Sequence, residues 1–200
     1  MSGRSRAGSF ARRIPVSLRI GLLSDTHGFL DPAVFTYFAD CDELWHAGDF
    51  GPVDVLNQLS DFKTLRSVSG NIDGAEVRSR VPSALSWEIE GVRVYMTHVG
   101  GYPGHYDRKV KRELLVYRPD LFVSGHSHIL RVMRDLELGL LHMNPGACGH
   151  HGWHQTRTIL RFSIEAAKVS DVEAIELGPR GRFVPKKMCE SGCVWSPSMR

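Results

Sequence analysis

The sequence predicts an α/β protein in which two packed β-sheets are flanked by helices. The early part of the chain alternates short apolar runs with helical patterns, which is typical of βαβ units and a parallel sheet. From residue 129 onward the pattern is mostly that of strands. The 200 residues suit one domain, and apolar (42%) and charged (24%) fractions are ordinary for a globular protein. A layered α/β sandwich accommodates both halves.

The early half is expected to contain three strands and two helices. Asp31 is the expected cap of the first helix and Pro32 its first helical residue. In chain order, the expected elements are a strand at 17–24, a helix from 31 that includes Phe38, a strand ending at Asp49, a helix over 51–59 and a strand at 63–68.

The later half is expected to be richer in strands. A basic amphipathic helix over 106–117 should end before Pro119, because the residue that precedes a proline disfavours helical geometry. The expected strands are 84–89 and 92–97, joined by a turn at Glu90-Gly91, then 121–124, 129–135, 140–143, 156–163 and 172–177.

The charge is distributed unevenly. Residues 1–19 carry five arginines and no acid, and residues 180–200 carry five basic residues and one acid, so the net charge of +3 leaves 3 − 5 − 4 = −6 for residues 20–179. An acidic body argues against nucleic-acid binding and suits a site that collects carboxylates for cations.

Three segments follow from these patterns: a disordered basic extension at 1–16, the domain at 17–178 and a C-terminal tail at 179–200. The extension resembles a transit peptide, and a disordered extension or cloning remnant explains it equally well. The four cysteines form no CxxC pair, which favours reduced thiols and a cytoplasmic protein. The sequence contains no run of eighteen apolar residues, so no membrane-spanning helix is expected.

Polar side chains follow five of the expected strands. They form the pieces Asp25-x-His27, Gly48-Asp49, Gly70-Asn71, Thr97-His98 and Gly125-His126-Ser127-His128. Open α/β sheets bind ligands at the carboxyl ends of their strands, so we expect these side chains to converge. An extended chain would also place Asp25 and His27 on the same side.

The donor set consists of oxygen and imidazole ligands with no thiolate, which suits divalent ions such as Mn²⁺, Fe²⁺, Zn²⁺ and Ni²⁺. Seven ligands exceed the needs of one ion that must also bind water. They are the right number for two ions that share a carboxylate.

In order and type, these motifs resemble those of the calcineurin-like metallophosphoesterases, and within them the small single-domain YfcE-type phosphodiesterases. The resemblance covers residues 17–178. It implies a four-layer αββα sandwich of two mixed β-sheets flanked by helices. It also implies a first metal held by Asp25, His27, Asp49 and His128, and a second held by Asp49, Asn71, His98 and His126.

The same resemblance implies hydrolysis of a phosphate ester by attack of metal-activated hydroxide, with Asp49, Asn71 and His98 central to catalysis. Two divalent cations are the expected cofactors, Mn²⁺ first and Mg²⁺ among the alternatives. A small phosphate ester is the expected substrate, no membrane is involved, and a homo-oligomer is compatible with the sequence.

Ile72 departs from the family pattern. Phosphomonoesterases of this family carry a histidine directly after Gly-Asn, where this chain has isoleucine. Since a general acid typically contributes about 10²–10⁴-fold, its loss favours a phosphodiesterase or an acid supplied from elsewhere. The candidate acids are His105, His150, His151 and His154.

Several other polar residues are expected to have structural roles. His46 should lie near the core, His142 should pack across strands, and Arg157 should lie on the surface. Asp73 is expected to orient Asn71 or a metal ligand through a hydrogen bond. Asn144-Pro145-Gly146 is expected to form a turn that positions the His126–His128 loop.

Two other functions compete with the phosphodiesterase. A scaffold subunit of the retromer coat has the same fold and serves mainly in protein binding, and Ile72 is compatible with such a role. A nuclease would need a basic groove, whereas the body here is acidic.

Overall fold

The computed structural model describes residues 17–181. The basic extension at 1–16, most of the tail at 179–200 and the cysteines at 189 and 193 lie outside the described residues. Cys41 and Cys148 are unpaired and buried.

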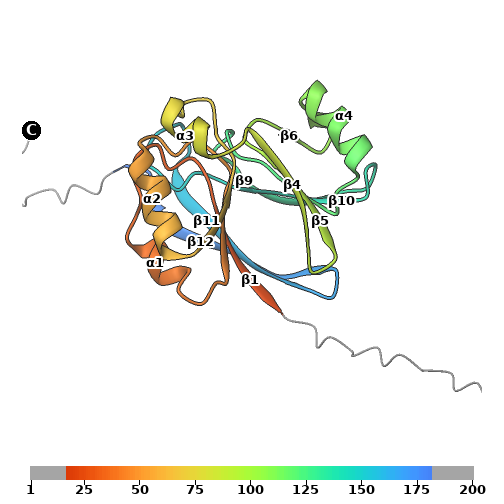
Figure 1. The fold of residues 1–200 in the computed structure, drawn as a ribbon, viewed down its shortest axis with the longest axis horizontal. Coiled ribbons are helices and arrows are strands. Elements are labelled where there is room, and N and C mark those ends of the chain that lie inside the picture. Colours follow the sequence, from red (N-terminus) through yellow and green to blue (C-terminus); the bar gives the residue numbers. More distant parts are fainter. Residues whose placement is uncertain (1–16, 182–200) are drawn as a thin grey trace, which may run out of the picture.

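Two five-stranded mixed sheets form the centre of the molecule (Figure 1). The first sheet has the order β12-β11-β1-β2-β3 and the second has the order β4-β5-β8-β10-β9. In the first, β1, β2 and β3 run parallel while β11 and β12 are antiparallel to their neighbours. In the second, β5, β8 and β10 are parallel, with β4 and β9 antiparallel at the edges.

The strands of the first sheet are Leu18–Leu23 (β1), Glu43–His46 (β2), Thr64–Ser67 (β3), Thr156–Glu165 (β11) and Lys168–Pro179 (β12). Those of the second are Ala84–Ile89 (β4), Val92–Thr97 (β5), Leu121–Val123 (β8), Leu130–Asp135 (β9) and Leu140–Pro145 (β10). The helices are Ala33–Tyr37 (α1), Val53–Phe62 (α2), Ala75–Arg80 (α3) and Arg108–Tyr117 (α4).

Three apolar clusters hold the layers together. The cluster between the sheets contains Trp45, Phe162 and Met96, all fully or almost fully buried. A second cluster packs α1 and α2 on the outer face of the first sheet, and a third packs α4 on the second sheet. Burying each large side chain contributes about 1.5–3 kcal/mol relative to exposure. The four-layer αββα prediction is confirmed.

The helix signals in the sequence correspond to real contacts. The Asp31 carboxylate accepts a hydrogen bond from the Ala33 amide (2.9 Å). Asp107 caps α4 by accepting from the amides of Lys109 (2.8 Å) and Val110 (3.1 Å). At the other end of α4, Arg118 adopts a left-handed conformation directly before Pro119.

Two short features were not expected. Residues 75–80 form α3, and residues 101–106 contain the small hairpin of β6 (Gly101–Tyr102) and β7 (His105–Tyr106), so Tyr106 lies in a strand and not in the helix expected over 106–117. Both segments are too short for periodicity to distinguish them from a loop.

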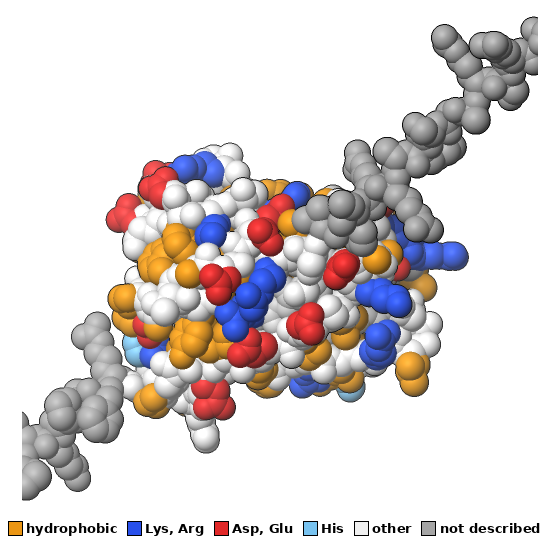
Figure 2. Space-filling model, turned by 90° about the horizontal axis from the view of Figure 1, so that it is seen from below, with side chains coloured by type: hydrophobic (Ala, Val, Ile, Leu, Met, Phe, Trp, Pro, Cys, Tyr) orange, Lys and Arg blue, Asp and Glu red, His pale blue; other side chains and the backbone are white. Residues whose placement is uncertain are grey.

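The described helices are too short to cross a lipid bilayer, and none of them forms a candidate membrane span. The face drawn in Figure 2 shows Asp and Glu side chains interspersed with Lys and Arg side chains and with apolar groups.

The prediction that Arg157 lies on the surface was wrong. Its residue is 6% exposed, and its guanidinium donates to the Asp31 carboxylate (2.6 Å) and to the carbonyls of Leu177 (2.8 Å) and Pro179 (3.2 Å). The tertiary position of α1 beside β11 and β12 creates this pair, and no local pattern encodes it.

We expect Arg157→Met to lower the free energy of unfolding by about 2–3 kcal/mol, because Asp31 and two carbonyls lose their donor. Urea denaturation measures this change. Arg93→Met is the matched control, since its ion pair with Asp120 is about half exposed and should contribute about 0–1 kcal/mol. Equal losses in the two variants would contradict the buried-pair interpretation.

Candidate metal centre

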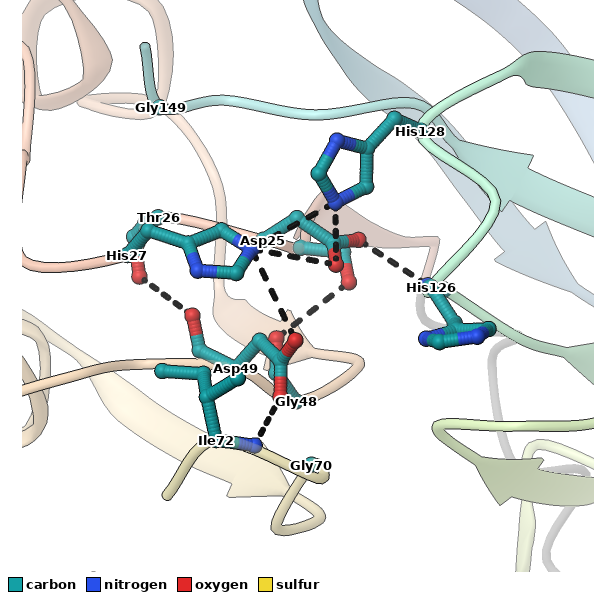
Figure 3. Close-up of polar contacts among 12 residues, drawn as sticks. Asp25, Thr26, His27, Gly48, Asp49, Gly70, Ile72, His126, His128 and Gly149 are labelled. Carbon is teal, nitrogen blue, oxygen red and sulfur yellow. Dashed lines mark hydrogen bonds and ion pairs between the residues drawn. The ribbon is translucent and has the colours of Figure 1, made fainter. Parts of the chain in front are cut away.

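The segments after β1 and β2 form the base of a polar site. The Asp25 amide donates to the Gly48 carbonyl, and the His27 amide donates to the Asp49 carbonyl, both at 3.0 Å. These bonds hold the two segments side by side (Figure 3). Asp25 and His27 lie beyond the end of β1 and have positive φ values of 55° and 46°. The expectation that an extended strand aligns them was wrong, because a turn brings their side chains together.

Positive φ recurs at the other candidate ligands. Asp49, His126 and His128 have φ values of 62°, 65° and 58°. Such backbone conformations cost about 1–3 kcal/mol each for residues other than glycine, and they cluster at functional sites. The surrounding hydrogen bonds must therefore hold each of these residues in place.

Asp49 is held by contacts from three directions. Its Oδ1 accepts from the Ile72 amide (3.0 Å), and its own amide donates to Asp73 (3.2 Å). Gly70 packs so closely that a Cβ there would lie 2.0 Å from Asp49 Oδ1. His46, stacked on the Phe50 ring at 3.7 Å, accepts from the Gly48 amide (3.1 Å).

The structural role predicted for His46 agrees with its position. Since its Nδ1 accepts a hydrogen bond from the Gly48 amide, its Nε2 carries the proton and donates to Thr26 Oγ1 (3.1 Å). Burial lowers the pKa of His46 to about 3, so the ring is neutral and supports the Gly48-Asp49 turn.

The first group of candidate ligands contains Asp25, His27 and His128, whose ligand atoms lie within 4.8 Å of one another. His128 Nε2 lies 3.1 Å from Asp25 Oδ1, and His27 Nε2 lies 3.8 Å from the same oxygen. Figure 3 shows the two imidazoles pointing toward this carboxylate.

The second group contains Asp49, His98 and His126, again within 4.8 Å. His98 Nε2 lies 3.2 Å from Asp49 Oδ2 and 3.0 Å from Asn71 Oδ1. His98 Nδ1 donates to the Ala47 carbonyl (2.7 Å), which leaves Nε2 with a lone pair in the neutral ring. All seven sequence-predicted ligands therefore meet at one place.

Asp73 supports the site through the backbone and makes no hydrogen bond to the Asn71 side chain. Its Oδ2 accepts from the amides of Asp49 and Gly70 (2.7 Å for Gly70), and its Oδ1 accepts from Gly51 (3.0 Å). Asp73 thus ties the turn after β2 to the turn after β3.

The loop that carries His126 and His128 is fixed in a similar way. The His126 amide donates to Asp25 Oδ2 (3.1 Å), and Asn144 Nδ2 donates to the Gly125 carbonyl (2.7 Å). Asn144 Oδ1 accepts from Gly146 (2.9 Å), so the expected turn does position this loop. His142 is buried next to Ser124, 3.0 Å from its hydroxyl, as its packing role predicted.

The arrangement fits divalent cations. Asp25 is fully buried, and its Oδ1 has no hydrogen-bond partner among the described residues. Burial would raise the pKa of Asp49, but the hydrogen bond and charge of His98 hold that pKa below its ordinary value. Burial lowers the pKa of His27. Two buried carboxylates this close together would be costly without a positive charge between them.

A pocket of about 400 Å³ opens onto both groups of ligands. Among the candidate acids, His151 and His154 line it; the His151 ring centroid lies 4.7 Å from that of His27. His150 packs on Phe29, and His105 packs on Tyr102 in the small hairpin. Ile72 lies in this pocket with 45% of its surface exposed.

A match to a known protein family shows which family this chain belongs to. The model of the calcineurin-like phosphoesterase superfamily domain matches residues 18–167, three quarters of the chain. The chain belongs to the calcineurin-like phosphoesterase superfamily. The resemblance inferred from the five motifs is confirmed.

Two relatives agree with this membership, and a solved structure shares the fold. A probable metallophosphoesterase from Methanothermobacter thermautotrophicus is 32% identical over 135 residues, covering 64% of this chain and 76% of the relative. A second, from Methanocaldococcus jannaschii, is 30% identical over 140 residues, covering 66% and 68%. Vps29 from Entamoeba histolytica, solved with Zn²⁺, shares the fold with a TM-score of 0.61 at 13% identity, covering 82% of this chain and all of that one.

Sequence reasoning missed two residues of this calcineurin-like site. Trp153 and Ile129 line the pocket and are 99% and 56% exposed. The available signal was an isolated tryptophan in a loop otherwise rich in glycine and histidine, Gly149 to His154.

Proposed function

We propose that this protein is a dinuclear metal-dependent phosphodiesterase. The observation that carries the proposal is the position of Asp49 between the two groups of ligands. Its Oδ2 lies 3.6 Å from His27 Nε2 of the first group and 3.2 Å from His98 Nε2 of the second. A carboxylate in this position suits a ligand shared by two cations.

In this proposal, one ion is held by Asp25, His27, Asp49 and His128, and the other by Asp49, Asn71, His98 and His126. Two divalent ions bound there would lower the pKa of a water molecule and neutralise charge on the phosphate oxygens. The mixture of oxygen and nitrogen ligands suits Mn²⁺, with Fe²⁺, Zn²⁺, Ni²⁺ and Mg²⁺ as alternatives.

The chain's own residues would keep this geometry rigid during turnover. The Ile72 amide binds Asp49 Oδ1 and so directs Oδ2 into the site. The Ala47 carbonyl fixes the orientation of the His98 ring, and Asp25 Oδ2 fixes the start of the His126 loop. Preorganised ligands of this kind need little rearrangement when a substrate binds.

A diester is favoured over a monoester by the shape of the surroundings. A second pocket, of about 480 Å³, adjoins the first, and Asn71 lines both. A phosphodiester carries two organic groups, and these two pockets can each receive one. Ile72 supplies no proton for a poor leaving group, and this also favours a diester.

Hydrolysis of bis(p-nitrophenyl) phosphate tests the proposal. After treatment with EDTA the protein should be inactive, and Mn²⁺ should restore turnover. We expect kcat/KM for phenyl phosphate, whose phenolate is a poor leaving group, to be roughly 10²-fold lower, because a missing general acid costs at least that factor. A folded, metal-loaded protein with no turnover across several metals would contradict the proposal.

A protein-binding role is the second candidate, favoured by Ile72 and by the likeness to Vps29. It gives no physical reason for two buried carboxylates and four clustered histidines. A cytoplasmic location, a small substrate and self-association stay predictions.

A further inference from the structure

A loop beside the metal centre, residues 149–155, is held firmly in place; we call it the histidine loop. A Cβ at Gly152 (φ 115°) would lie 2.0 Å from His128 Nδ1, so the backbone is packed against that candidate ligand. Arg180 donates from its guanidinium to the Gly152 carbonyl (2.5 Å) and from its amide to the Gln155 carbonyl (2.8 Å). The Gly149 amide donates to the Asp25 carbonyl (3.0 Å).

The histidine loop presents an apolar wall to the pocket. Trp153 is 99% exposed, and with Ile129 (56%) and Ile72 (45%) it lines the same pocket of about 400 Å³ as the candidate ligands. These three residues form what we call the Trp153 wall. They come from three separate segments, which meet only in the folded protein.

Isolated exposed apolar side chains are common and need no explanation. Leu136 and Val116, at 92% and 86%, are of this kind, and neither lines the pocket of the metal centre. Trp153 differs because its loop is anchored on both sides and because two further apolar side chains share its pocket. The pocket also has the volume of a typical small-molecule site.

We propose that the Trp153 wall receives a planar aromatic substituent of the phosphate ester. This inference rests on the proposed function and names the class of substrate within it: aryl or nucleoside phosphodiesters. With the phosphate at the ligand groups, a substituent that points into this pocket meets the indole. The rings of His151 and His154 add further flat surfaces in the same pocket. Aromatic rings stack on such surfaces, and flexible alkyl groups gain less.

Binding of three phosphonates to the Mn²⁺-loaded protein, measured by calorimetry, tests the inference without turnover. Phenylphosphonate, cyclohexylphosphonate and methylphosphonate share the anionic group and differ in the substituent. We expect phenylphosphonate to bind roughly tenfold more tightly than methylphosphonate, which is the scale of one aromatic stacking contact. Cyclohexylphosphonate should fall between them.

Trp153→Ala should reduce the phenyl-to-methyl ratio of affinities to about one, and Trp153→Phe should retain most of it. Leu136→Ala, the matched control, should leave the ratio unchanged. Equal affinity for phenyl and methyl in the wild type, or cyclohexyl binding as tightly as phenyl, would overturn this inference while the metal-dependent phosphodiesterase stands. Failure of all three phosphonates to bind, together with absent turnover, would instead overturn the proposed function.

Discussion

Asp49→Asn is expected to lower kcat/KM for bis(p-nitrophenyl) phosphate by about 10³-fold or more. Replacing groups that merely orient metal ligands already costs about 10–100-fold. Asp49 is a candidate ligand of both ions, so its loss should weaken the two sites together. Asparagine keeps an oxygen that can accept from the Ile72 amide, which should preserve the fold.

Metal content and circular dichroism distinguish the causes of this loss. Fewer than two Mn²⁺ per chain, with an unchanged spectrum, would agree with the shared-ligand role. Asp54→Asn is the matched control because it makes the same chemical change at an exposed position on α2. Wild-type turnover in Asp49→Asn would contradict the proposal that Asp49 is a ligand of both ions.

Ile72→His is expected to raise kcat/KM for phenyl phosphate, which has a poor leaving group, by roughly 10²-fold. The Ile72 side chain lines the pocket of the metal centre, and its amide lies 3.0 Å from Asp49 Oδ1. An imidazole there could protonate the leaving oxygen, a contribution of about 10²–10⁴-fold. The gain should be smaller with bis(p-nitrophenyl) phosphate, because its p-nitrophenolate group leaves readily without a proton.

Ile72→Gln separates proton transfer from mere polarity, because glutamine offers hydrogen bonds but no titratable proton. Only the histidine variant should lose its gain as the imidazole is deprotonated at high pH. An equal gain in both variants would mean that isoleucine excludes monoesters by its shape or hydrophobicity.

The layers of the fold and the residues that make up the candidate site could be predicted from the sequence. The strands expected at 17–24 and up to Asp49 correspond to β1 and β2, which end at Leu23 and His46, and the polar residues after them do converge. These signals are local and strong, because a parallel sheet places the carboxyl ends of its strands at one edge.

Side-chain positions that depend on contacts between residues far apart in the chain could not be predicted from the sequence. Asp25 and His27 are aligned by a turn tied to Gly48 and Asp49, which no pattern of alternation reveals. Arg157 pairs with Asp31, which lies 126 positions away in the chain, and Trp153 shares a pocket with Ile129 on a loop that Arg180 holds in place. Ligand roles for the seven convergent side chains stay predictions until metal is measured.

The unusual backbone of the ligands has a consequence for how such an enzyme can evolve. Asp25, His27, Asp49, His126 and His128 all require a left-handed conformation, which few residue types tolerate. The three residues of the Trp153 wall have no such requirement. Substitutions in the Trp153 wall can therefore change substrate specificity while the candidate metal ligands stay the same. A mutant library for altered specificity should be built on those three positions.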